Sequence, residues 1–272
     1  MPAARRRLNL EQVVDDLVIR LRFILPPIGN VARTHPLFGL GDEPHLASIF
    51  REARIWWLTN ELGQLDADGR RSLIDEVLER NADEAILASV GLFGSASFPE
   101  LTEDDVERMQ AWYELPRPPP RAIRDALALR VLTVWFIAKP SQIVTEKLES
   151  WLLSTTAGLL RAALVVSVGL AHQSSSRHGS LLVRALNCIP VILNLGESDV
   201  DSAAGWLLSS VWPIEPSLIE DWLHAHGALL SRKVFRIAVG RMPTHVRSQL
   251  TTAWKAQRQR QRLNAAKGKS TC

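Results

Sequence analysis

The sequence has little cysteine and no long apolar run, and each scarcity excludes a class of protein. Two cysteines in 272 residues cannot build a disulfide framework, so we expect a reducing compartment, with the cytoplasm as the default. The longest apolar run, residues 159–171, contains Arg161 and is shorter than the roughly 20 residues of a membrane-spanning helix. No continuous apolar segment follows the basic N-terminus, and we therefore expect no signal peptide.

Net charge is also small, at +3, so a polyanionic partner has to be argued from where the charges lie. Positive charges cluster in residues 254–272, which lack acidic residues and contain Lys255, Arg258, Arg260, Arg262, Lys267 and Lys269. This segment is either a phosphate-binding arm, because each neutralised phosphate releases a counterion, or a solvated and partly disordered terminus.

Apolar residues recur at spacings of three and four along nearly the whole chain, which predicts an all-α fold. Thr102 and Asp105 form a predicted capping box, Pro140, Pro216 and Pro243 lie at helix starts, and Gly196 and Gly227 lie at helix ends. The predicted helices span 10–24, 44–63, 69–80, 82–94, 102–115, 120–138, 141–153, 156–172, 178–195, 198–212, 215–226, 231–241 and 243–262.

Helices of this length, paired at about 40 residues, are typical of a HEAT-like helical-repeat superhelix. We predict one such domain over residues 1–250, with a concave basic face, followed by a basic extension over 251–272. Clean self-similarity between repeats is absent, and an irregular helical domain remains the alternative. The proline-rich segment 114–122 is interpreted as a stiff surface connector or a partner-binding motif.

The helix predicted over 198–212 places its tryptophan in an unusual position. Trp206 has serines as neighbours at helical spacing, whereas the apolar stripe lies elsewhere on the helix. We therefore expect Trp206 to lie off the core. The serines are Ser202, Ser209 and Ser210, and the stripe is Ala203, Ala204, Leu207 and Val211.

Several short elements, in this order, resemble the HEAT-like alkylpurine DNA glycosylases of the AlkD type. They are Gly41 with Pro44, Trp151, Arg161-Ala162-Ala163, Gly205-Trp206 and Ser231-Arg232-Lys233. The resemblance spans roughly residues 35–242. It implies a monomeric enzyme that excises N3- or N7-alkylated purines from duplex DNA without a metal or cofactor, for general repair or for protection against a DNA-alkylating agent.

The resemblance also implies roles for individual residues. Trp206 would rest against the sugar of the alkylated nucleotide, and Arg161 would bind a phosphate next to it. Arg232 and Lys233 would contact the DNA backbone elsewhere. The alternative for Arg161 is a structural pairing with a carboxylate of the adjacent repeat.

The closest candidate for the catalytic carboxylate is Asp125, which would stabilise positive charge on the deoxyribose and orient a water. Asp125 faces away from its helix's apolar stripe; it would point into a groove or form an ion pair with Arg121. Arg121 stands where the family has a tryptophan, and Trp112 is the candidate replacement if it is not a core residue. Gly158 and Ser209 also depart from the family pattern.

These departures leave a second function open: a noncatalytic helical-repeat module that binds nucleic acid or a protein partner. The histidines do not form a metal set, since His224 and His226 fall on different helix faces and no cysteine pair accompanies them. We expect no cofactor, no metal and no membrane partner. The other tryptophans fit helix packing, namely Trp56, Trp57, Trp135, Trp212, Trp222 and Trp254.

Overall fold

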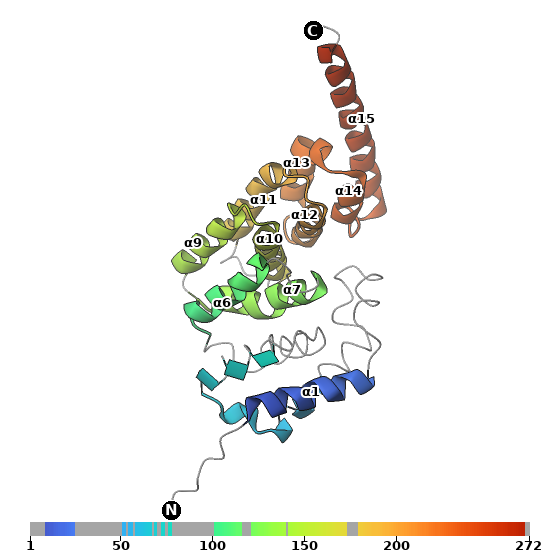
Figure 1. Ribbon diagram of the computed structural model, residues 1–272. Coiled ribbons are helices and arrows are strands. Elements are labelled where there is room, and N and C mark those ends of the chain that lie inside the picture. Colours follow the sequence, from blue (N-terminus) through green and yellow to red (C-terminus); the bar gives the residue numbers. More distant parts are fainter. Residues whose placement is uncertain are drawn as a thin grey trace, which may run out of the picture. The chain divides into compact units, whose positions relative to one another are not determined.

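The computed structural model describes residues 9–24, most of 51–77, 101–115, 121–139, 141–172 and 179–269 (Figure 1). Its regular elements are helices, and no β-strand occurs in these ranges, which confirms the all-α prediction. The chain divides into two compact units, residues 1–138 and 139–272, and each is considered by itself. The predicted helix at 82–94, Gly41 with Pro44, Trp57 and residues 116–120 lie outside the described part.

Two side-chain hydrogen bonds each connect two separate segments of the first unit. The Trp56 indole Nε1 donates to the carbonyl of Val13 (2.8 Å), and the Tyr113 hydroxyl donates to the carbonyl of Arg124 (2.8 Å). The helical elements of this unit are α1 (Leu10–Ile24), the 3-10 turn η2 (Leu62–Gln64), α6 (Glu103–Glu114), α7 (Arg121–Leu127), the π-helical segment η4 (Ala128–Leu132) and α8 (Thr133–Ala138).

The predicted capping box at the start of α6 is confirmed. The backbone N–H of Asp105 donates to the Thr102 hydroxyl (3.3 Å), and the N–H of Thr102 donates to the Asp105 carboxylate (2.9 Å). Two backbone donors at the helix start, where no intrahelical acceptor exists, are thereby satisfied.

Two helices, α10 and α12, form the centre of the second unit. Every residue of α10 from Gly158 to Ala171 is buried, and so is every residue of α12 from Ala203 to Val211. Helix α12 packs against α10, α11, α13 and α14. The unit contains α9 (Ser141–Leu152), α10 (Ala157–His172), α11 (Gly179–Leu193), α12 (Ser198–Val211), α13 (Pro216–His226), the 3-10 turn η6 (Gly227–Leu229), α14 (Arg232–Ala238) and α15 (Thr244–Lys269).

Three of the prolines and glycines predicted at helix starts and ends lie at those positions. Pro216 is the first residue of α13, and Gly227 is its C-cap. Gly196, after α11, has φ +73°, a left-handed conformation that favours glycine. Helix α15 continues through residue 250, where the sequence places the start of the basic extension, and ends at Lys269. The domain boundaries and the repeat superhelix stay predictions.

Gly205 allows α12 and α14 to approach closely. A Cβ atom added to Gly205 would lie 2.9 Å from the carbonyl oxygen of Val234 and 3.1 Å from its Cγ1 atom. A contact of this length with backbone forces one helix to move, since a carbonyl cannot rotate away as a flexible side chain can. Helix packing therefore explains the glycine of the Gly205-Trp206 motif.

We predict that Gly205→Ala lowers the free energy of unfolding by about 1–3 kcal/mol, the usual cost of overpacking a core. The matched control is Gly179→Ala in α11, because a Cβ there meets nothing within 4 Å. Gly179→Ala should be neutral or stabilising by up to about 1 kcal/mol. Urea unfolding followed by circular dichroism measures both, and equal stability of the two variants would refute the packing role.

Candidate functional site

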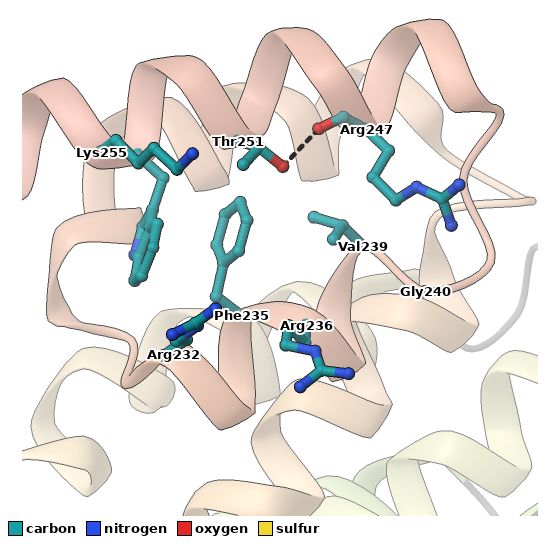
Figure 2. Close-up of a pocket in the computed structure, with 9 residues that line it drawn as sticks. Arg232, Phe235, Arg236, Val239, Gly240, Arg247, Thr251 and Lys255 are labelled. Carbon is teal, nitrogen blue, oxygen red and sulfur yellow. Dashed lines mark hydrogen bonds between the residues drawn. The ribbon is translucent and has the colours of Figure 1, made fainter.

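A basic groove lies between α14 and α15 (Figure 2). Its volume is about 440 Å³, and it is lined by Arg232, Phe235, Arg236, Val239 and Gly240 from the α14 side and by Arg247, Thr251, Trp254 and Lys255 from α15. Four of these nine residues are cations, and none is an acid. We call the four, Arg232, Arg236, Arg247 and Lys255, the groove cations.

Helix α14 presents its residues in two rows because of their spacing. Arg232 and Arg236 are four residues apart and exposed, whereas Phe235 and Val239 are four apart and buried. Ser231 precedes them as the N-cap, and its hydroxyl accepts a hydrogen bond from the backbone N–H of Val234 (3.3 Å). The Ser231-Arg232-Lys233 motif therefore starts a helix and places two cations in its first turn.

Aromatic packing fastens α15 to α14. The rings of Phe235 and Trp254 stack with centroids 4.7 Å apart and an interplanar angle of 15°. The Arg258 guanidinium lies 5.5 Å from the centre of the Trp254 ring, and its Nη1 donates to the carbonyl of Leu230 (2.9 Å). The groove thus has an aromatic floor that holds the two helices together and a rim of positive charge.

A second hollow adjoins the groove at Arg232 and Arg236. It has a volume of about 730 Å³ and is also lined by Lys233 and Ile237. Within the described part of the chain, the groove cations and Lys233 have no ion-pair partner, and all five are exposed. Their charges repel one another, so an anion bound between them would be stabilised.

Arg161 belongs to the second unit but does not line the groove, and it is buried, with 2 % of its surface exposed. Its Nη1 donates to the backbone carbonyl of Asp199 and to the hydroxyl of Ser202 (3.1 Å), both within the first five residues of α12. The Ser202 hydroxyl donates in turn to the Asp199 carbonyl (2.8 Å). These bonds connect α10 to α12, and they satisfy part of the guanidinium's hydrogen-bonding capacity without a phosphate.

The structure corrects the expectation that Trp206 lies off the core, because this side chain is 4 % exposed. Ser209 and Ser210, its neighbours on α12, are buried as well. Helices pack around α12 on several sides, so polar neighbours do not mark a solvent-facing surface. Ser210 has a polar contact at the edge of the core, with 3.3 Å between its Oγ and the Nε2 of His172, which is exposed.

Asp125 and Trp112 belong to the first unit. The Asp125 side chain is 1 % exposed, on a stretch of α7 where Ala126 and Leu127 are also buried, which corrects the expectation that it points into an open groove. Trp112 is half-buried on α6. Arg161, Trp206, Arg232 and Lys233 all belong to the second unit, and within it only the last two line the basic hollows.

Two titratable groups, one in α12 and one next to it, have shifted pKa values. Burial, and secondarily the charge of Glu197, raises the pKa of Asp201 in the first turn of α12. Burial, and secondarily the charge of Arg241, lowers the pKa of His172 at the end of α10. Both shifts favour the neutral form of the group, as expected for side chains next to a packed helix.

The prediction that Trp254 fits helix packing agrees with its stacking on Phe235. Arg236 and Arg247, by contrast, were not among the predicted site residues. Their spacing was the available signal. Arg232 and Arg236 are one turn apart, and Arg247, Thr251 and Lys255 continue at four-residue intervals on the next helix. Such rows of cations on two consecutive helices predict a shared basic face once the helices are known to pack together.

The described residues contain no cluster of three or more histidine, cysteine or acidic side chains that would hold a metal ion. Among the helices that the structure describes, none combines the length and apolar character needed to cross a membrane.

Comparison with known proteins identifies the family. Residues 55–242 match the family model described as DNA alkylation repair enzyme. No curated protein and no solved structure matches the chain. The matched region includes α14 with Arg232 and Lys233 and stops before α15. The chain therefore belongs to the family of DNA alkylation repair enzymes, and its role is in the repair of alkylated DNA.

Proposed function

We propose that the protein is a DNA glycosylase that hydrolyses the N-glycosidic bond of N3- or N7-alkylated purines in duplex DNA. The match to the DNA alkylation repair enzyme family over residues 55–242 carries this proposal. The exposed cations of α14 support it, because a duplex offers regularly spaced phosphates to such a surface. We further propose that the protein acts as a monomer in the cytoplasm, without a metal or cofactor, in general repair or in protection against a DNA-alkylating agent.

The chemistry asks little of the enzyme, because an alkylated purine is cationic and already a good leaving group. When the C1′–N bond breaks, its electrons neutralise the purine, and positive charge develops on the deoxyribose. A water then adds to C1′ and loses a proton. In the proposed mechanism the Asp125 carboxylate stabilises that charge and orients the water, while the face of Trp206 rests against the sugar.

Asp125 and Trp206 are buried, so this assignment requires that binding of the damaged nucleotide uncovers them. Arg232 and Lys233 are exposed and need no such change to contact phosphates. In this proposal Arg161 acts differently from its expected role as a phosphate ligand: it holds the start of α12 against α10 and so positions Trp206.

The alternative is a noncatalytic relative that binds DNA or a protein partner. The replacement of the family's usual residues by Arg121, Gly158 and Ser209 favours it, and so does the burial of Asp125. The two functions differ in whether a base is released from the duplex.

We predict that the wild-type protein releases N7-methylguanine from a methylated duplex, measured by chromatography of the free base. Asp125→Asn should lower the rate at least about 100-fold, because it removes charge stabilisation at the transition state, with affinity for the duplex unchanged. Since Asp125 is buried, the folded fraction of the variant is measured by circular dichroism. Binding without base release by the wild type at micromolar concentration would establish the noncatalytic alternative, and a fully active Asp125→Asn variant would show that another acid is used.

A second prediction distinguishes a positioning role of Arg161 from a role in phosphate binding. Arg161→Ala should lower the free energy of unfolding by about 2–4 kcal/mol, because it leaves a cavity and removes hydrogen bonds to α12. Arg232→Ala, its exposed counterpart, should change stability by less than about 0.5 kcal/mol but weaken DNA binding.

Urea unfolding and fluorescence anisotropy with a labelled duplex measure the two quantities on both variants. If Arg161→Ala were as stable as the wild type but bound DNA weakly with a flatter salt dependence, Arg161 would be a phosphate ligand as the family resemblance implies.

A further inference from the structure

Helix α15 has an extreme charge composition. Its 26 residues, Thr244–Lys269, include no aspartate or glutamate. Its seven cations are Arg247, Lys255, Arg258, Arg260, Arg262, Lys267 and Lys269. Like charges three or four residues apart, such as Lys255 with Arg258, destabilise an isolated helix, and no acid within α15 compensates them. A bound polyanion would remove this repulsion.

The groove places part of this charge next to the cations of α14. Arg247 and Lys255 line it from α15 and Arg232 and Arg236 from α14, and all four side chains are exposed (Figure 2). Arg247 and Lys255 are eight residues apart, roughly 12 Å along the helix axis. Duplex DNA presents one phosphate per roughly 3.4 Å of axis on each strand, so this distance corresponds to three or four phosphates.

The aromatic floor indicates which part of a nucleic acid the groove would contact. Trp254 already stacks on Phe235, which is buried, and has Arg258 over its ring. These contacts hold α15 in place, so the rings serve helix packing rather than base stacking. The chemistry left for a ligand is the positive rim, which fits backbone phosphates and gives no preference for base sequence.

The family match stops at residue 242, before α15 begins. We propose that the groove between α14 and α15 is a phosphate-backbone site for duplex DNA, contributed jointly by the family region and by a helix beyond it. Arg236, Arg247 and Lys255 enlarge the contact that Arg232 and Lys233 begin. This inference rests on the proposed function, because the duplex is the substrate assigned there.

The test compares two full-length triple variants with the wild type. Arg236→Gln/Arg247→Gln/Lys255→Gln removes three groove charges, and Arg236→Lys/Arg247→Lys/Lys255→Arg keeps them. The probe is an undamaged, fluorescently labelled duplex of about 20 base pairs, and anisotropy gives its Kd over a series of KCl concentrations. All three substituted side chains are exposed, so urea unfolding should give wild-type stability for both variants.

The plot of log Kobs against log salt should flatten by about 2 to 3 in the glutamine variant, since each released counterion contributes about 0.9 to the slope. The charge-keeping variant should retain the wild-type slope. An unchanged slope in the glutamine variant would overturn the proposal, and so would an equal loss in the charge-keeping variant.

Base release separates this proposal from the proposed function. A wild-type protein that binds duplex with a groove-dependent slope but releases no N7-methylguanine would retain the groove site and lose the glycosylase activity. A protein that releases the base, but whose salt slope does not depend on the groove cations, would retain the glycosylase activity and lose the groove site. If the glutamine variant loses binding of poly-glutamate while its binding of the duplex is unchanged, the groove binds an acidic protein instead.

Discussion

The close packing of α12 against α10 and α14 is the contact on which the rest of the second unit depends. On one side Arg161 donates to the first turn of α12, and on the other Gly205 allows the backbone of Val234 to approach. Arg161 is buried and its Nη1 donates to two acceptors of α12, and Gly205 leaves no room for a Cβ atom. Two of the short motifs on which the resemblance was based thus have a structural explanation.

The proposed DNA-binding surface follows from that contact. Helix α14 has seven residues, and its buried face is fixed by α12, so its opposite row of cations is exposed. Phe235 then receives Trp254, which brings the acid-free helix α15 alongside. Core packing and electrostatics are therefore linked: a shift of α14 would separate the groove cations. Positive charge gathered in this way is stabilised by a counter-anion, and the proposed DNA ligand would supply one.

The sequence predicted most of the fold, because helix signals are local. The capping box of Thr102 and Asp105 and the stop at Gly196 involve neighbouring residues only. The site was harder to predict. Trp206 was assigned off the core from helical periodicity, which fails for a helix enclosed on several sides. Two acceptors of Arg161 lie 38 and 41 residues away, and one of the two is a backbone carbonyl, which no side-chain pattern encodes. Phe235 and Trp254 become partners only when α14 and α15 fold together.

The most direct test of this account is a structure of the protein bound to a duplex that carries a stable analogue of an N7-alkylated purine. The account predicts backbone phosphates within hydrogen-bonding distance of the groove cations and Lys233, with Arg161 still bonded to the first turn of α12. A duplex seated on a different surface, with the groove between α14 and α15 empty of phosphate, would contradict it.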